Sequence, residues 1–182
     1  MSKFTNFINR ISNWKTLVGL ILLYILFPAV LFRNAEEEIN ALAGKDVGII
    51  DLTFGFNPQR TLQMVEDYGE TGRHYYAMAV LTIDSIFPVA YAFLFAVMIT
   101  LIYRQLIGGP VRYLNLLPFV AMGFDFLENI AIVSMLKHYP EQSVTIATLC
   151  EIFKLFKWIV FGLFIFLVIY GLIKLLLKSG KA

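Results

Sequence analysis

Four long runs of apolar residues are separated by shorter stretches in which polar and charged residues gather. A bilayer core about 30 Å thick requires about 20 mostly apolar residues of helix. The runs that meet or nearly meet this length predict membrane spans at about 16–33, 75–103, 113–136 and 144–177. Backbone polar groups in lipid must be satisfied within the chain. We therefore predict an all-α membrane protein, a four-helix bundle with a loop of about 40 residues, 34–74, between the first two spans.

The composition agrees with this picture and excludes other classes of protein. The 182 residues are 59% hydrophobic and 15% charged, whereas soluble domains are about 45–50% apolar and about 25% charged. A single cysteine, Cys150, excludes an internal disulfide and a zinc site built on several cysteines. The net charge of +2 gives no argument for a nucleic-acid partner. We expect one integral membrane domain over residues 1–182.

The charged residues outside the spans indicate how the chain is oriented in the membrane. Basic residues without acids precede span one, separate spans two and three, and follow the apolar core of span four: Lys3, Arg10, Lys15, Arg104, Arg112, Lys174, Lys178 and Lys181. The acids outside the spans all fall in the 34–74 loop or the 137–143 loop. We expect the protein in the plasma (inner) membrane. By the positive-inside rule, both termini should lie in the cytoplasm and the long loop should lie outside. The first run lacks an Ala-x-Ala site before Arg33, so an uncleaved span is expected rather than a signal peptide.

The 34–74 loop contains two segments with local signals of their own. Asn57 followed by proline is typical of a helix N-terminus, which predicts a short amphipathic helix from Pro58 to Tyr68 that ends at Gly69. The apolar stretch 47–56 is consistent either with a re-entrant, lid-like segment or with a surface loop that has a few buried anchors.

Acidic side chains inside the predicted spans are the main candidates for a functional site. An acid at a span centre costs roughly 2.5–3.5 kcal/mol on insertion scales, so such residues should face the bundle interior or a cavity. Asp125, Glu128 and Asn129 have i, i+3, i+4 spacing and share one helix face. Asp84 and Tyr91, seven residues apart, share a face of the second span.

The fourth span adds cations at a similar depth. Glu151, Lys154 and Trp158 fall on one stripe, with Lys157 to one side of it. Counting about 1.5 Å of rise per residue from the span ends places the polar residues of spans two, three and four between the midplane and the outer surface. We therefore predict an intramembrane polar pocket that opens outward.

The predicted pocket supports three functions, which the sequence leaves open. The first is binding, with or without chemical modification, of a lipidic or small amphipathic molecule. The second is a proton- or cation-coupled transporter or channel subunit, and the third is a structural or assembly role in which the acids only join helices. For the first function we assign Asp125 and Glu128 as the proton-handling, catalytic pair. Ligand binding is assigned to Asp84, Tyr91, Asn129, Lys154, Lys157 and Arg73.

Other partners and groups are constrained less strongly. Membrane lipids and a small amphipathic ligand are the expected partners, and neither a cofactor nor a metal is expected. His74 and His138 are interpreted as separate residues near the outer surface. Arg73 could pair with a lipid phosphate or with an acid of the bundle, or it could extend to the interface from a helix end. The oligomeric state is left open.

Three groups of residues resemble a family of small four-span membrane proteins that brings no activity with it. They are Gly72-Arg73 with Tyr76, Asp84 with Pro88 and Tyr91, and Phe124-Asp125 with Glu128-Asn129. The run Asp84-Ser-Ile-Phe-Pro88-Val-Ala-Tyr91-Ala-Phe93 is also similar to a span of the EXPERA family. That family includes four- and five-span sterol isomerases and sterol-binding proteins. Its intramembrane histidine has no counterpart here, so no catalytic residue is carried over.

Overall fold

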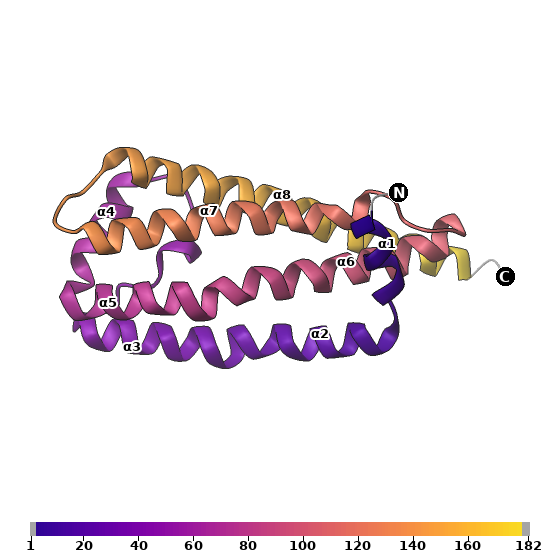
Figure 1. The fold of residues 1–182 in the computed structure, drawn as a ribbon, viewed down its shortest axis with the longest axis horizontal. Helices are drawn as coiled ribbons and strands as arrows, with labels where there is room; N and C mark the ends of the chain where they lie inside the picture. The colour runs from indigo at the N-terminus through magenta and orange to yellow at the C-terminus, as the bar shows by residue number, and fades with distance from the viewer. Residues whose placement is uncertain (1–2, 180–182) are drawn as a thin grey trace.

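The computed structural model describes residues 3–179, and every regular element in that range is a helix. Four helical segments are long and apolar enough to cross a membrane: Trp14–Ala43, Gly69–Ile107, Leu114–His138 and Val144–Lys178. Figure 1 shows them side by side along the long axis of the molecule. The predicted all-α fold with four membrane-spanning helices is confirmed. Lys181, counted above among the basic residues, lies outside the described residues.

The first membrane-spanning segment extends well beyond its predicted end. It consists of α2 (Trp14–Leu26), a π-helical turn (Phe27–Phe32) and α3 (Arg33–Ala43). The π-helical turn contains Pro28, which cannot donate the backbone hydrogen bond of a regular helix. Residues 34–43, expected in the loop, continue the helix because Ala35 and Ile39 are buried where α3 packs against the second span. The helix ends at Gly44, whose positive φ of 68° suits a residue without a side chain.

The second segment also contains an irregular turn, and a proline follows four residues after its end. Its parts are α5 (Gly69–Ala79), a π-helical turn (Val80–Asp84) and α6 (Ser85–Ile107). Pro88 removes the hydrogen bond that the carbonyl of Asp84 would accept in a regular helix. Asn129 of the third segment donates to that carbonyl from its Nδ2 at 3.4 Å. The broken helix is thus repaired by a neighbouring helix, as expected for proline inside a membrane.

The third and fourth segments form a helical hairpin. A 3-10 turn (Leu114–Leu116) leads into α7 (Leu117–His138), and a short loop connects α7 to α8 (Val144–Ser179). Near its C-terminal end α8 crosses α6 closely at Gly171: a Cβ atom there would overlap Cγ2 of Ile102. Tyr103 Oη donates to the carbonyl of Leu167 at 3.1 Å in the same crossing.

We expect Gly171→Ala to destabilise the protein, because the added methyl group overlaps a β-branched side chain that has little rotamer freedom. Overpacking of this kind typically costs about 1–3 kcal/mol. Thermal unfolding in detergent measures the effect, with Gly162→Ala as a matched control in the same helix, since no atom lies within 4 Å of a Cβ built there. Equal stability of the two variants would show that the crossing is not tightly packed.

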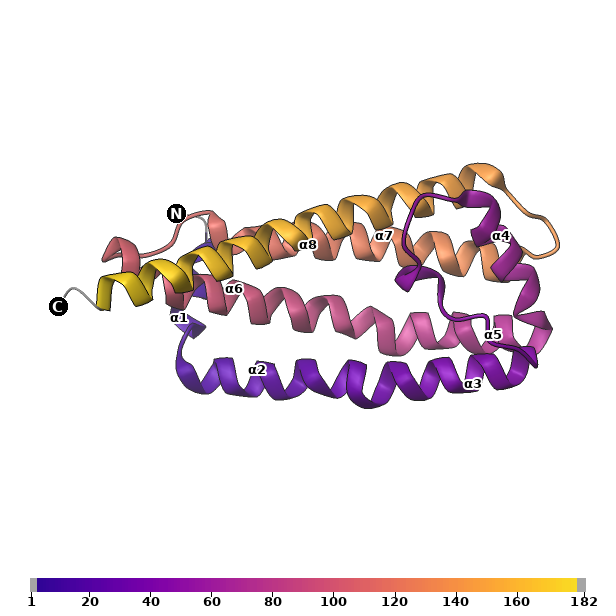
Figure 2. The ribbon, with the colours of Figure 1, turned by 180° about the vertical axis from the view of Figure 1, so that it is seen from behind.

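Residues 44–68 lie over one end of the bundle, which we call the loop end. The predicted helix is confirmed as α4 (Pro58–Asp67), with the Asn57 side chain accepting from the backbone N–H of Arg60 at 3.0 Å. Figure 2 shows the preceding segment running from α3 to α4 across the bundle. Within it a 3-10 turn (Ile50–Leu52) places Ile50 in the core, whereas Phe54 is 83% exposed.

A buried phenol helps to hold this loop. The hydroxyl of Tyr68, between α4 and α5, donates to the carbonyl of Gly48 at 3.0 Å. Burial, reinforced by nearby acids, raises the pKa of Tyr68, so the phenol keeps its proton and remains a donor. Gly48 accepts this contact from a backbone with φ of 73°, a conformation that glycine adopts without strain.

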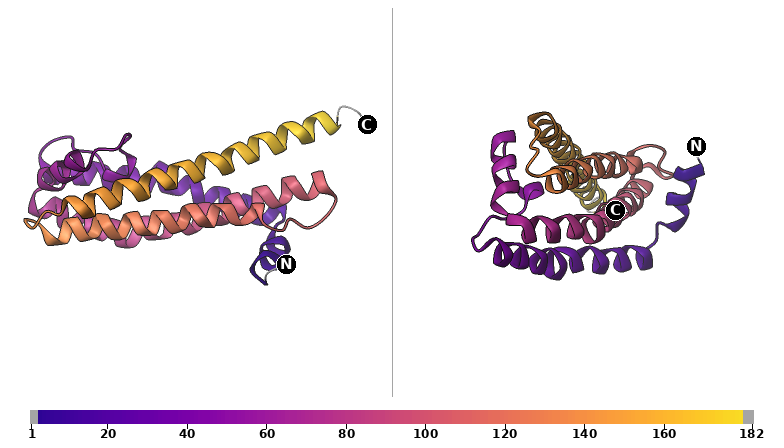
Figure 3. Two further views of the ribbon diagram at one scale, coloured as in Figure 1. Left: turned by 90° about the horizontal axis from the view of Figure 1, so that it is seen from above. Right: turned by 60° about the vertical axis from the view of Figure 1, so that its left-hand side comes forward.

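The short helix α1 (Lys3–Ile11) lies at the opposite end from the loop. Arg104 of α6 donates from Nη2 to the carbonyls of Asn9 and Ser12, both at 3.1 Å, and so joins α1 to the bundle. Figure 1 places α1 and the C-terminal part of α8 at the same end of the molecule. Figure 3 shows that α1 runs across the direction of the long helices rather than along them.

Helix α2 is the least buried part of the bundle. None of its residues is buried, although α2 packs against α6. Its main aromatic contact is Tyr24, whose ring centroid lies 5.5 Å from that of Phe87. In the right-hand view of Figure 3, the α2–α3 segment forms the outer row of the bundle, beside α5 and α6.

Candidate functional site

A cavity of about 560 Å³ lies near the loop end, between the first segment and the rest of the bundle. This volume falls within the range of about 300–1,000 Å³ that is usual for small-molecule sites. Its charged lining residues are Arg33, Glu36, Asp51, Asp84, Asp125 and Lys157. Its other lining residues are Tyr24, Pro28, Phe32, Ile49, Leu52, Phe87, Tyr91, Trp158 and Phe161. Acids and bases therefore share one cavity with a largely aromatic wall.

The aromatic wall is a chain of ring contacts between three helices. Phe87 lies between Tyr24 and Tyr91, with ring centroids 5.5 and 5.4 Å away. Tyr91 contacts Phe161 edge-on at 5.5 Å, and Phe161 contacts Trp158 at 5.7 Å. Each offset or edge-to-face pair of rings contributes stabilising free energy in addition to that of the apolar area it buries. These contacts therefore hold the wall in a defined arrangement.

Lys157 of α8 connects the two acids predicted to share a face of α7. Its Nζ lies 2.6 Å from Glu128 Oε2 and 3.6 Å from Asp125 Oδ1. Tyr91 donates from its hydroxyl to Asp125 Oδ2 at 3.0 Å. Asp125 and Lys157 line the cavity, whereas Glu128 lies behind them and is fully buried. Two carboxylates therefore share one ammonium group, and only one of the two carboxylates faces the cavity.

Asp84 contributes differently from Asp125. Its side chain lines the cavity and is 8% exposed, yet no side chain among residues 3–179 donates to its carboxylate. Asn129, expected to orient a ligand, instead donates to the backbone carbonyl of Asp84 and lines a separate groove between α7 and the second segment. Asn129 therefore supports the helix that presents Asp84, while the Asp84 carboxylate faces the cavity without a partner.

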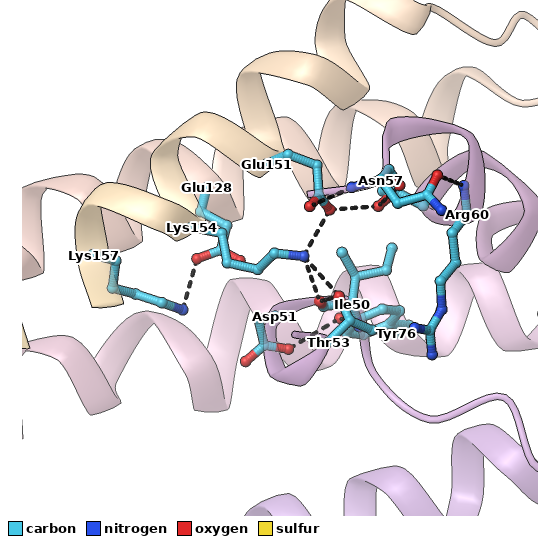
Figure 4. A network of polar contacts seen from close by, with 11 residues as sticks. Ile50, Asp51, Thr53, Asn57, Arg60, Tyr76, Glu128, Glu151, Lys154 and Lys157 are labelled. Atoms are coloured by element: carbon cyan, nitrogen blue, oxygen red, sulfur yellow. Dashed lines mark hydrogen bonds and ion pairs between the residues drawn. The ribbon is translucent and has the colours of Figure 1, made fainter. Parts of the chain in front are cut away.

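A second buried ion pair, Glu151 with Lys154, does not line the cavity. Lys154 Nζ lies 2.6 Å from Glu151 Oε1 and donates to Thr53 Oγ1 at 2.6 Å. The same carboxylate accepts from Thr61 Oγ1 at 2.7 Å and from the backbone N–H of Asn57 at 3.2 Å. Figure 4 shows Lys154 and Glu151 directed at the loop, and Lys157 directed at Glu128. Lys154, predicted as a ligand-binding residue, thus joins the loop to α8.

Sequence reasoning missed Asp51 as a site residue. It follows buried Ile50 in the 3-10 turn, lines the cavity, and accepts from the hydroxyl of Tyr76 at 3.3 Å. The same hydroxyl accepts from the backbone N–H of Ile50 at 2.9 Å, so the turn is fixed to α5. The available signal was a single acid inside the apolar stretch 47–56.

Arg73 lies apart from the other predicted site residues. Its guanidinium group stacks over the ring of Tyr139 at 3.8 Å and donates from Nη1 to the carbonyl of Val65 at 3.3 Å. It lines a different hollow, together with Glu70 and Lys137. The structure therefore brings together Asp84, Tyr91, Asp125, Glu128 and Lys157 and leaves Arg73 outside this group.

The described residues contain no group of three or more His, Cys, Asp or Glu side chains arranged to hold a metal ion. His74 lies beside Arg73 at the separate hollow, and His138 Nδ1 is 2.8 Å from the carbonyl of Ser134. Compared with family models, curated proteins and solved structures, the chain matches none of them.

Proposed function

We propose that this multi-pass membrane protein binds a lipidic or small amphipathic molecule in the cavity. The observation that carries the proposal is the two-part lining: rings such as Phe87 and Phe161 cover one part, and carboxylates such as Asp84 and Asp125 cover another. An amphipathic molecule can place its apolar body against the rings and its polar group against the acids. The location of the cavity within the spans gives such a molecule access to the apolar phase in which it concentrates.

The contrast between the two ion-pair networks supports binding over a purely structural role for all the acids. Glu151 and Lys154 have hydrogen-bond partners in the loop and leave no polar atom directed at the cavity. That network suffices as a structural connection between helix and loop. Asp125 contacts Tyr91 and Lys157 on neighbouring helices, but Asp84 faces the cavity without a side-chain donor, so its carboxylate joins no helices and is free to meet a ligand.

Proton handling within the site is part of the proposal. Asp125 can contact a bound molecule directly, while Glu128 acts on it through Lys157. The Tyr91 hydroxyl extends this chain of polar contacts to the aromatic wall. A shared ammonium group between two carboxylates allows one proton to be taken up or released with little rearrangement, which is the requirement for acid–base chemistry or for proton-linked binding.

The orientation in the membrane is also a proposal, and it is supported by the distribution of charge. Arg104, Lys174 and Lys178 lie toward the end that carries α1. The acids of α3 and α4, including Glu37 and Asp67, lie toward the loop end. With the basic end in the cytoplasm of a plasma membrane, the cavity lies toward the outer side.

A variant that fills the cavity tests the proposed function. We expect Leu52→Trp, which adds an indole ring to the cavity lining, to remove a bound molecule that co-purifies with the gently extracted protein. Native mass spectrometry measures the bound mass. Leu176→Trp is the matched control, since Leu176 is 74% exposed near the end of α8. A bound mass that persists in Leu52→Trp, or is absent from the unsubstituted protein, contradicts binding in this cavity.

A further inference from the structure

The cavity contains more negative than positive groups. We call the lining formed by the Ile50–Leu52 turn and by spans two, three and four the inner wall. Three carboxylates lie in this wall, those of Asp51, Asp84 and Asp125, and the carboxylate of Glu128 lies directly behind it. Lys157 is the only basic residue that faces them among the described residues of the inner wall. Lys154 is engaged with Glu151, and Arg33 at the rim pairs its Nε with Glu37 Oε1 at 2.9 Å. One ammonium group therefore faces an excess of carboxylates.

Such an imbalance inside a membrane protein is costly, because unpaired charges away from bulk water lose their solvation. Two kinds of positive charge can compensate it: bound protons, or a cationic group of the ligand. A neutral ligand leaves the excess uncompensated, and an anionic ligand increases it. The composition of the wall therefore discriminates between classes of amphipathic molecule.

The rings around the acids favour an organic cation in particular. Trp158, Tyr91 and Phe87 line the same cavity as Asp84 and Asp125. Aromatic faces attract ammonium groups through the ring quadrupole, and the attraction is larger where water is excluded. Acids and rings in one cavity are the combination by which proteins recognise ammonium ligands, while the remaining apolar wall accommodates a hydrocarbon body.

Asp84 is the carboxylate best placed to pair with such a ligand. Asp125 already accepts from Tyr91 and lies near Lys157, and Asp51 accepts from Tyr76. Asp84 has no donor from any side chain in the described part of the chain, although it is 92% buried and faces the cavity. A buried carboxylate without a donor is expected to have a partner in the functional state.

We infer that the ligand of this cavity is a cationic amphiphile, an amine or ammonium group on an apolar body, with the cation bound between Asp84 and the aromatic wall. This inference rests on the proposed function, that the cavity binds an amphipathic molecule. It adds the sign of the charge that the cavity selects and the residue that selects it.

Three probes with the same alkyl chain test the inference: dodecylamine, dodecanol and dodecanoate. The chain has two tryptophans, so Trp14→Phe leaves Trp158 in the cavity wall as the only reporter of fluorescence. We expect dodecylamine to change that fluorescence, near neutral pH, at a concentration at least about tenfold lower than dodecanol, as the gain of one charged hydrogen bond predicts. Dodecanoate should bind more weakly than either.

A charge-removing variant assigns the selectivity to Asp84. Asp84→Asn should weaken dodecylamine binding about tenfold and leave dodecanol unchanged. Glu38→Gln, which removes an exposed acid outside the cavity, is the control and should change neither.

The possible failures are distinguishable. If no probe changes the fluorescence, or if Leu52→Trp still retains the bound probe by native mass spectrometry, the proposed function itself fails. Binding of dodecanol or dodecanoate as tightly as dodecylamine leaves the proposed function intact and overturns the cationic ligand. The comparison of the three probes uses protein with an intact cavity, so it decides the question even if Asp84→Asn does not fold.

Discussion

Lys157→Met should lower the free energy of unfolding by about 3–5 kcal/mol, the usual cost of removing one partner from a buried ion pair. The ammonium group lies 2.6 Å from Glu128 and 3.6 Å from Asp125, and all three side chains are buried. Methionine preserves much of the side-chain volume but leaves both carboxylates without a cation. Denaturant titration in detergent micelles measures the loss, with Lys137→Met, an exposed change on α7, as the control.

A second substitution separates the loss of charge from the loss of packing. In the double variant Lys157→Met, Glu128→Gln, the deeper carboxylate is neutral, so we expect a large part of the stability to return. No recovery in the double variant would mean that the side chains, rather than their charges, hold this part of the bundle together. A neutral effect of Lys157→Met alone would contradict the ion pair.

Lys154→Met should have an effect of similar size, about 3–5 kcal/mol, for a different reason. It leaves Glu151, which is 2% exposed, without its ion-pair partner, and it also removes the donor to Thr53 in the loop. The 44–57 segment should therefore open more often, and limited proteolysis should cleave it faster than in the Lys137→Met control.

The two lysines are further distinguished by ligand binding. Lys154→Met leaves every lining side chain in place but loosens the segment that carries Asp51 and Leu52, so we expect a smaller loss of affinity than in Lys157→Met, which changes the cavity wall itself. Unchanged cleavage of the loop in Lys154→Met would contradict the connection between loop and helix. A loss of affinity in folded Lys154→Met as large as that in Lys157→Met would contradict this difference between the two lysines.

Helical spacing predicted which acids lie together at the centre of the site, because the direction of side chains along one helix depends only on local geometry. The i, i+3 relation of Asp125 and Glu128 places both on the face of α7 that meets α8, and Lys157 reaches both. The high cost of an acid facing lipid correctly directed Asp84 to the interior. The span number followed from apolar length in the same way.

Features that depend on tertiary contacts could not be predicted. The first helix extends to Ala43 because Ala35 and Ile39 pack against the second span. The charged residues around these two positions gave no indication of a buried helix face. Asp51 joins the site only because Tyr76 fixes the turn that carries it. Arg73 and Asp84 share one helical segment, but Arg73 faces Tyr139, away from the cavity.

The two lysines show that nearby positions on one helix can have unrelated roles. Lys154 and Lys157 are three residues apart, a step that turns the side chain by about 60° from its starting direction. This turn directs Lys154 to the loop and Lys157 to the acids of α7. Spacing alone could not assign these partners, because the loop reaches α8 from a distant part of the chain.

The sparse packing of α2 determines which wall of the cavity is the easiest to displace. Tyr24 and Pro28 form part of this wall, yet no residue of α2 itself is buried. The walls formed by α7 and α8 contain buried ion pairs and packed aromatic rings, so moving them exposes charge as well as apolar surface. Outward movement of α2 disrupts few contacts in comparison, and in a bilayer its apolar surface stays in lipid. For the proposed ligand, the α2 side is therefore the expected route of entry from the membrane.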